Sequence, residues 1–465
     1  MIIVTHKHIP GIYKALADAV VYHFRTTNAI QDPEHLEHRA MNQRTLDIYV
    51  VWAFISIFSR YFYSLIKIKN RTPYYIFNVK NVEVGRYSAS SVLRNPAAAL
   101  SPVAFFFLFH VTLLRSVFVY AAALRGRNEI DAIFLGDISY LDGIWLDYFL
   151  NREGVVVYLK QHPHGMLCVK RSHPSLLDFL KSEGVSSTPL TQEVQEKVET
   201  LMKRRLQDPA SSIFYYNVEN EPLRSPVETV SATTKVVVYA HAFTDAQLEG
   251  GFDGFRDMHQ WLRFTVDELS KQSSKVQVYL KAHPNFFSGR SASQRESLDK
   301  YVWDHLVKDL PKSVVVIDYP VSNFELLSSL EPARDVLVSH HGNALVEGAF
   351  LGFRTISSAV SPWFTNYEFS NTWMGKANYS RLLASIGSLP PSTSLKMTSA
   401  RKFAADFYLQ EKGEFSESWY MPIISRHSTI SQATLENDPY SLPLLKGISN
   451  QRLIEELSDS VKISN

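Results

Sequence analysis

The sequence predicts an α/β protein with two Rossmann-like domains, and three observations predict it. The chain has 465 residues and is 45% hydrophobic, enough for two domains that each bury a core. Short apolar runs alternate with amphipathic segments of helical period, first over residues 131–184 and again over residues 235–358. A polar stretch with two prolines lies near residue 225, between the two series. Strand, helix, strand order is the unit from which parallel sheets are built.

The first alternating series is short. Residues 131–136 (DAIFLG) are typical of a buried strand, residues 140–154 of an amphipathic helix, and residues 155–160 (VVVYLK) of the next strand. Residues 172–184 add a second helix, with Pro174 in its first turn and a glycine at its end. The N-terminal half therefore contains at least one Rossmann-like core.

The second alternating series is longer and clearer. It contains five expected strands and four expected helices, and its first helix has apolar residues at three-to-four spacing. The strands are expected at residues 235–243, 275–284, 313–318, 335–339 and 354–358. The helices are expected at residues 254–272, 293–310, 323–330 and 343–353. Such a series forms a doubly wound sheet, whose ligands bind at the carboxyl ends of the strands.

These patterns divide the chain into three parts. Residues 1–225 form the expected N-terminal domain and residues 226–390 the expected second domain. Residues 391–465 contain two expected helices, 399–413 and 450–462, each with a short apolar stripe for packing back on the two domains.

Composition excludes several functional classes. The 48 Lys and Arg residues nearly balance the 46 Asp and Glu residues, so a dedicated nucleic-acid binder is not expected. The single cysteine, Cys168, excludes an intramolecular disulfide and any CxxC metal site, and fits a reducing compartment. The N-terminus lacks the layout of a secretory signal. The sequence thus predicts a cytoplasmic protein that binds small molecules.

Two apolar segments complicate that picture. Residues 95–114 contain no charged side chain and have Arg94 and Arg115 at their ends, whereas residues 48–67 are interrupted by Arg60. Each segment is close to the roughly 20 residues that cross a bilayer. Three interpretations remain open: core or interdomain helices, helices lying on the inner face of the cell membrane, and membrane-spanning helices.

Polar side chains follow three of the strands in the second series. Because consecutive parallel strands bring their carboxyl ends to one edge of a sheet, we expect these side chains to converge. A lysine, several histidines and backbone N–H groups at the start of a helix suit a phosphate or diphosphate. The candidate residues are His241 and Asp245 after the first strand, Lys281 and His283 after the second, and Ser339, His340, His341, Gly342 and Asn343 after the fourth.

Glu347 lies one turn into the following helix, where its carboxylate could accept hydrogen bonds from a ribose diol. The sequence lacks GxGxxG and GxxxxGK[ST], which argues against a standard dinucleotide fold and a P-loop NTPase. No HExxH motif or cysteine partner supports a metal. The remaining prediction is nucleotide recognition without a metal.

Each of these residues also has a purely structural interpretation. The His283-Pro284 pair is typical of a strand terminator, and Gly342 serves equally well to start a helix. The two adjacent histidines could be a hydrogen-bonded pair in the core. Their shared position at successive strand ends is what favours a site.

The motifs resemble a known family. LKAHP, followed by DVLVSHHGNALVEGAFLGFRTI, is similar to the donor-binding half of bacterial surface-polysaccharide glycosyltransferases of the capsule-synthesis type, which include Kdo transferases. The matching residues are Lys281, His283 and Pro284 in the first motif, and Asp335, Ser339, Gly342, Glu347 and Gly352 in the second. The sequence departs from the family at Gly348, where alanine is usual, and at residues 341–343, where many relatives have a pair of hydroxyl residues. That departure leaves CMP, UDP, GDP and dTDP all open as the nucleotide.

The resemblance implies the two-domain GT-B fold, with a cleft between the domains and a nucleotide-sugar co-substrate in place of a cofactor. It also implies an inverting, metal-independent transfer of the sugar to a surface glycan or lipid-linked acceptor on the first domain. Such a reaction needs a general base near the anomeric carbon. Asp142 and Asp137 are the first candidates, Asp245 is an alternative from the donor side, and His162 and His164 follow.

Two other functions remain open. A CDP-polyol phosphotransferase of the teichoic-acid type resembles this sequence in its own K-x-HP strand end, and transfers a phosphate group in place of a sugar. A non-catalytic glycan-binding protein with the same fold is the alternative outside enzymes.

Overall fold

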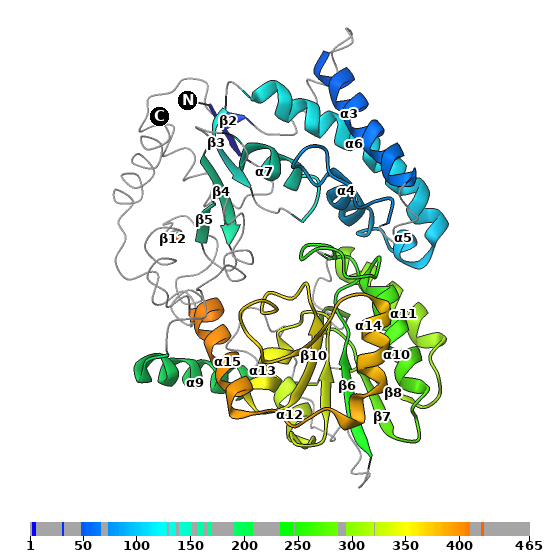
Figure 1. Cartoon of the computed structure of the whole chain (residues 1–465), viewed down its shortest axis with the longest axis vertical. Helices are drawn as coiled ribbons and strands as arrows, with labels where there is room; N and C mark the ends of the chain where they lie inside the picture. Colours follow the sequence, from blue (N-terminus) through cyan, green and yellow to red (C-terminus); the bar gives the residue numbers. More distant parts are fainter. Residues whose placement is uncertain are drawn as a thin grey trace. The chain divides into compact units, whose positions relative to one another are not determined.

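In the computed structural model the chain divides into two units (Figure 1). The first unit comprises residues 1–92, 103–179 and 412–465, and the second comprises residues 93–102 and 180–411. The residues that the structure describes are 2–5, 30–31, 48–66, 73–127, 130–135, 139–150, 152, 156–161, 165–169, 190–207, 233–245, 247–286, 294–319, 321–409 and 420–422.

The second unit is built on a six-stranded sheet in the order β11-β10-β9-β6-β7-β8, and all its strand pairs are parallel. Valine-rich runs form the central strands, and these are buried on both faces, as a parallel sheet requires. The strands are β6 (Thr234–Tyr239), β7 (Val276–Lys281), β8 (Val314–Ile317), β9 (Val336–Val338), β10 (Arg354–Ser358) and β11 (Asn371–Trp373). The five predicted strands are confirmed, and β11 is an addition.

Helices connect these strands. They are α10 (Met258–Ser270), α11 (Gln294–Lys308), α12 (Asn323–Ser328), α13 (Ala344–Phe350), α14 (Lys376–Ala384) and α15 (Ser394–Ala404), with the short helices η4 (Pro284–Phe286), η5 (Ile386–Ser388) and η6 (Ala405–Leu409). Helix α10 begins four residues later than predicted, because Asp257 is its N-cap and accepts a hydrogen bond from the Gln260 N–H. Its predicted apolar stripe is buried.

Two segments outside residues 226–390 belong to the second unit. In α5 (Pro96–Leu100), Ala99 lies in this unit's core and its carbonyl accepts a hydrogen bond from the Arg256 guanidinium at 2.8 Å. Helix α9 (Gln192–Gln207) contacts α12 and α15, buries Val198 and Met202, and places Glu199 3.9 Å from Arg401. The units therefore do not follow the predicted boundaries at residues 225 and 390, because apolar helix faces, and not the polar linker, decide where each segment packs.

The first unit contains a mixed six-stranded sheet in the order β12-β5-β4-β3-β1-β2. The pairs β2-β1, β1-β3 and β3-β4 are parallel, and β4-β5 and β5-β12 are antiparallel. The strands are β1 (Ile2–Thr5), β2 (Ile30–Gln31), β3 (Ile130–Leu135), β4 (Val156–Gln161), β5 (Gly165–Val169) and β12 (Tyr420–Pro422). The predicted α/β class with two Rossmann-like sheets is confirmed. The predicted helices at 172–184 and 450–462 lie outside the described residues.

The helices of the first unit are α3 (Ile48–Ile66), α4 (Val84–Val92), α6 (Pro102–Gly126) and α7 (Gly143–Leu150). Helices α3 and α6 lie side by side in Figure 1, and the Tyr61 hydroxyl is 2.6 Å from Nε2 of His110. Both are long and apolar enough to cross a membrane by length and composition. Helix α6 is buried over most of residues 116–123, whereas its N-terminal half and most of α3 expose large apolar side chains.

Candidate functional site

Three histidines from three neighbouring strand ends lie together at the carboxyl edge of the second unit's sheet. His341 follows β9, His241 follows β6 and His283 follows β7, and these strands are adjacent in the sheet. The ring centroids of His241 and His341 are 4.2 Å apart, and those of His241 and His283 are 5.9 Å apart. All three side chains are partly exposed. We call His241, His283 and His341 the histidine rim. The structure thus brings together residues that the sequence predicted to converge.

Two members of the rim are neutral at physiological pH. Burial and, to a lesser extent, His340 lower the pKa of His241 to about 4, while Asp245 opposes the shift. Burial also lowers the pKa of His283 to about 3, with contributions from His241 and Lys281. A neutral imidazole offers one N–H donor and one acceptor nitrogen. Each of these rings is therefore suited to hydrogen-bonding an anion without adding a full charge.

The cation of the site is Lys281, the last residue of β7, which is 8% exposed. Burial lowers its pKa to about 8, and the nearby Glu347 opposes that shift. Glu347 is 1% exposed and accepts a hydrogen bond from Nδ2 of Asn323 at 2.6 Å. The Asn323 side-chain oxygen in turn accepts one from the Tyr239 hydroxyl at 2.7 Å. The proposed ribose contact of Glu347 stays a prediction.

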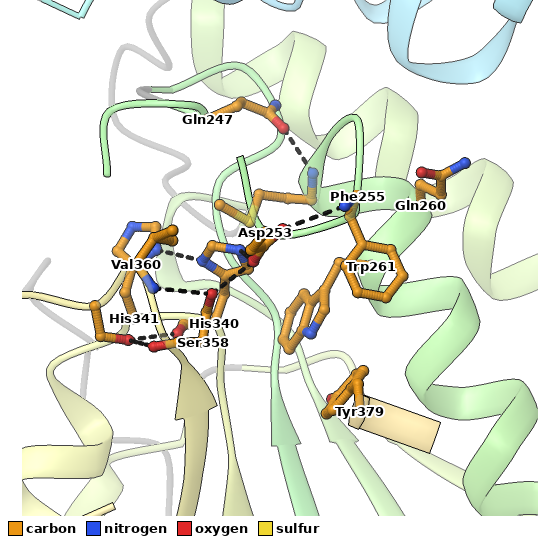
Figure 2. Close-up of polar contacts among 12 residues, drawn as sticks. Gln247, Asp253, Phe255, Gln260, Trp261, His340, His341, Ser358, Val360 and Tyr379 are labelled. Carbon is orange, nitrogen blue, oxygen red and sulfur yellow. Dashed lines mark hydrogen bonds and ion pairs between the residues drawn. The ribbon is translucent and has the colours of Figure 1, made fainter. Parts of the chain in front are cut away.

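The two adjacent histidines have different environments. His340 is 4% exposed, and its ring lies edge-on to Trp261 and Trp373, with centroid distances of 5.6 Å to each. Its Nε2 is 2.7 Å from Oδ2 of Asp253, and its Nδ1 is 2.6 Å from Nδ1 of His341 (Figure 2). His340 therefore lies beneath the rim and links the partly exposed His341 to a buried carboxylate.

Sequence reasoning missed Asp253, which is 3% exposed. Its Oδ2 also accepts a hydrogen bond from the Ser358 hydroxyl at 2.6 Å. Burial raises the pKa of Asp253, but contact with His340 and the hydrogen bonds from the Ser358 hydroxyl and the Phe255 N–H together outweigh burial, so the pKa is lowered overall. Gly254, beside it, has φ of +110°, and a Cβ there would lie 2.9 Å from Cα of Gly375. The run EGGFDGF was the available indication, because such glycines mark a loop forced into close contact with its neighbours.

The 339–343 turn joins β9 to α13. Ser339 is buried, and its hydroxyl accepts a hydrogen bond from the Gly342 N–H at 3.3 Å. A Cβ on Gly342 would lie 2.8 Å from that hydroxyl oxygen, which explains the glycine. Asn343 is exposed and makes no side-chain cap bond to α13. The turn is thus held by Ser339 and leaves Asn343 at the surface.

A second buried carboxylate that sequence reasoning missed, Asp299 on α11, holds the turn after β6. Its Oδ1 accepts hydrogen bonds from the backbone N–H groups of Phe243 at 2.8 Å and Thr244 at 2.7 Å. Nothing in the apolar pattern of residues 293–310 singles out this aspartate. It positions the segment that carries His241 and Asp245.

The predicted acid and base residues lie in different places. Asp245 is partly exposed, close to His241 in the second unit. Asp142 is partly buried at the start of α7 in the first unit, and its carbonyl accepts a hydrogen bond from the Trp145 N–H at 3.0 Å. Asp137, His162 and His164 lie outside the described residues. Among the described residues, no group of three His, Cys, Asp or Glu side chains has the arrangement of a metal site.

No family model matches this sequence, and no curated protein matches it. Among solved structures, the chain is similar to KpsC of Thermosulfurimonas dismutans, a β-Kdo 2,4-transferase, with a TM-score of 0.38 and 17% identity over 60% of this chain and 81% of that one. It is also similar to a UDP-forming trehalose-phosphate synthase from Burkholderia xenovorans (TM-score 0.29, 8% identity, 66% of this chain and 64% of that one). The N-terminal domain of Candida albicans trehalose-6-phosphate phosphatase matches at a TM-score of 0.26 and 10% identity, over 64% of this chain and 57% of that one.

Proposed function

We propose that this chain is a glycosyltransferase that moves a sugar from a nucleotide-activated donor to a surface glycan or lipid-linked acceptor. One observation carries the proposal. Three adjacent parallel strands place the histidine rim and Lys281 together at the carboxyl edge of the sheet, where α/β sheets bind their ligands. Lys281, His283 and His341 lie in the K-x-HP and SHHGNALVEG motifs, which resemble the glycosyltransferase family.

In this proposal the donor phosphates contact Lys281, the histidine rim and the 342–343 backbone, and Glu347 contacts the ribose. Lys281 supplies a positive charge in a site with little exposure to water, where electrostatic interactions are strengthened. Fixed donors of this kind stabilise the charge that develops on the leaving phosphate without a metal ion.

An inverting transfer also needs a base for the acceptor hydroxyl. Asp142 and Asp137 are the candidates from the first unit, where the acceptor is proposed to bind, and Asp245 is the candidate from the second unit.

The test is nucleotide binding measured by thermal unfolding. The panel contains CMP-, UDP-, GDP- and dTDP-sugars together with CDP-glycerol and CDP-ribitol. A ligand at a concentration of 100 times its Kd stabilises the folded protein by about 2.7 kcal/mol. We expect one nucleotide class to raise Tm in the wild type and to lose most of this effect in Lys281→Met. The matched control is Lys275→Met, because Lys275 is an exposed residue just before β7.

The panel also distinguishes the alternatives. Stabilisation by CDP-glycerol or CDP-ribitol alone would replace the glycosyltransferase proposal with the polyol-phosphotransferase, which the K-x-HP resemblance also supports. Stabilisation by no nucleotide would contradict both enzymes and leave a glycan-binding protein.

We also propose that the first unit contacts the inner face of the cell membrane through α3 and α6. The exposed large apolar residues are Ile48, Trp52, Phe54, Ile55, Phe62, Tyr63 and Ile66 on α3, and Val103, Phe106, Phe107, Val111 and Leu114 on α6. Neither helix contains Asp or Glu, and Arg60 and Arg115 are exposed beside this surface. An apolar face edged only by positive charge suits an anionic lipid surface. Burial of α6 over most of residues 116–123 in the protein favours a helix lying in the interface over one that crosses the membrane.

Cosedimentation with phosphatidylglycerol-containing vesicles tests membrane contact. The double variant Phe106→Ser/Phe107→Ser is expected to bind at least about tenfold more weakly, because two partly inserted rings are lost. The control Leu395→Ser, at an 81% exposed position on α15, is expected to bind normally. Equal binding by both variants, or none by the wild type, would contradict this contact.

A further inference from the structure

We propose that the His340–His341 pair couples anion binding at the histidine rim to the uptake of one proton. This inference rests on the proposed function, because it concerns how the same site accepts a donor phosphate. It starts from a continuous chain of three groups, in which Asp253 contacts His340 at 2.7 Å and His340 contacts His341 at 2.6 Å (Figure 2).

The hydrogen-bond pattern restricts where protons lie in this chain. An ionised carboxylate only accepts hydrogen bonds, so Nε2 of His340 carries a proton and donates it to Asp253. The two Nδ1 atoms are 2.6 Å apart, and a bond of that length holds a single proton between them. That shared proton is bonded either to His341 or to His340. Its position determines whether the outer nitrogen of His341, Nε2, is a hydrogen-bond donor or an acceptor.

The pair therefore has two states that differ by one proton. In the neutral state His340 has no proton on Nδ1, so Nδ1–H of His341 donates to it. Nε2 of His341 then carries no proton and can only accept a hydrogen bond. In the cationic state one proton from solvent binds Nε2 of His341, and the shared proton moves to Nδ1 of His340. The positive charge then lies on His340, in direct contact with the Asp253 carboxylate, and His341 has an outer N–H donor.

A phosphate oxygen near pH 7 accepts hydrogen bonds and carries negative charge. It is repelled by the unprotonated Nε2 of His341 in the neutral state and accepts a hydrogen bond from the Nε2–H of the cationic state. Binding of a phosphate at His341 therefore selects the cationic state and takes up one proton. Because His340 is 4% exposed and enclosed by Trp261 and Trp373, only Asp253 offers its charge a contacting counterion among the described residues.

The other titratable groups around the pair do not change their charge near pH 6.5. His241 and His283 have pKa values of about 4 and about 3, so they stay neutral above pH 5. Lys281 has a pKa of about 8 and is already charged at pH 6.5. Asp245 acts on His241 and Glu347 acts on Lys281 as negative charges. A proton taken up at about pH 6.5 is therefore assigned to the His340–His341 pair.

Isothermal titration calorimetry at about pH 6.5 tests the inference, in two buffers that differ in ionisation enthalpy. The probes are UDP-glucose and CMP-Kdo, whose phosphate diesters do not titrate near this pH, and the other activated sugars of the panel if neither binds. We expect the wild type to take up between about half a proton and one proton on binding. His341→Gln keeps an N–H donor that does not titrate, so it should bind more weakly than the wild type and take up no proton on binding.

Two further variants complete the experiment. Asp253→Asn removes the counterion of the cationic state and should reduce both uptake and affinity. The control His305→Gln changes a partly exposed histidine on α11, whose Nδ1 is 2.9 Å from the Tyr301 carbonyl oxygen, and should keep the wild-type uptake. If Asp253→Asn fails to fold, the comparison of wild type, His341→Gln and His305→Gln still decides the question.

The outcomes separate this inference from the proposed function. Binding by the wild type without proton uptake, or uptake that persists in His341→Gln, would overturn the coupling and leave nucleotide binding intact. Absence of binding by every activated sugar would overturn the proposed function, and the coupling with it.

Discussion

Two largely buried aspartates, one in each unit, have pKa values that are shifted in opposite directions. Asp253 in the second unit contacts Nε2 of His340 at 2.7 Å and has a lowered pKa. Asp147 on α7 in the first unit accepts hydrogen bonds from the Glu83 backbone N–H at 2.9 Å and the Tyr87 hydroxyl at 3.0 Å, and its pKa is raised to about 6. Both carboxylates accept hydrogen bonds, so hydrogen bonding alone does not decide the direction.

The difference lies in the charges nearby. Burial raises the pKa of both carboxylates, because it disfavours the ionised form. Asp253 has a partner that can carry a positive charge in direct contact. Asp147 has Arg86 in its surroundings, but that guanidinium pairs with Glu83 at 2.5 Å, and the Glu83 carboxylate raises the pKa of Asp147. Asp253 therefore serves as a permanent negative charge, and Asp147 as a group that titrates close to neutral pH.

The largest expected effect follows from removing Asp253. Asp253→Ala leaves His340 without its counterion and also removes the acceptor of the Ser358 hydroxyl, and loss of one partner of a buried pair costs about 3–5 kcal/mol. We expect a decrease of this size in the free energy of unfolding at pH 7, measured by urea denaturation. The control Asp267→Ala, which breaks a partly exposed pair with Arg263, should cost less than about 1 kcal/mol. Similar costs for the two variants would contradict the difference in environment.

A second prediction concerns pH and has opposite signs for the two aspartates. The folded pKa of Asp147 lies above its unfolded value, so its contribution to stability is fully present below about pH 4 and is lost as pH rises to about 6. The loss amounts to about 2 kcal/mol after allowance for its partial exposure. The lowered pKa of Asp253 instead stabilises the fold at neutral pH, and this contribution is lost only on acidification below its unfolded value, near 3.9.

Asp147→Asn tests the predicted decrease in stability as pH rises. The amide cannot ionise, so the variant should lose the decrease in stability between about pH 4 and 6 and should equal or exceed the wild type at pH 7. Urea denaturation at several pH values measures it, with amide exchange in α4 and α7 to localise the effect to the first unit. An unchanged pH profile would show that Asp147 does not titrate in this range.

The comparison also explains how far the sequence could predict the site. The strand ends were predictable, because apolar runs such as KVVVY and DVLVS are typical of strands buried on both faces of a parallel sheet, and the polar residues after each run mark where the strand ends. The different roles of His340 and His341 were not predictable, because the sequence does not show which of two adjacent histidines is buried. Packing of His340 against Trp261 and Trp373 distinguishes it from His341. Asp253 was missed because its partner lies 87 positions away in the sequence.

The placement of helices was harder to predict than their existence. Residues 95–114 were expected to be an apolar segment and residues 102–126 are helical, but a sequence that is apolar on all sides of a helix does not indicate which half is buried by protein. Helix α9 was assigned to the first domain from its position before the polar linker, whereas Val198 and Met202 are buried in the second unit. Long-range packing determines which half of α6 is buried and in which unit α9 packs. Local periodicity of the sequence gives no information about such packing.

The smallest predicted effect refines the account of Asp147. The Tyr87 hydroxyl donates to Oδ1 of Asp147, which lowers the pKa of this carboxylate against the larger effect of burial. Tyr87→Phe removes that bond, so the pKa of Asp147 should rise further and the free energy of unfolding at pH 7 should fall by about 1 kcal/mol. The control Tyr148→Phe alters a partly buried tyrosine on the same helix as Asp147. Carbon-13 NMR of labelled aspartate side chains measures the pKa directly. An unchanged or lower value in Tyr87→Phe would mean that the tyrosine hydroxyl does not favour the ionised carboxylate, and that burial, Glu83 and Arg86 determine the pKa of Asp147.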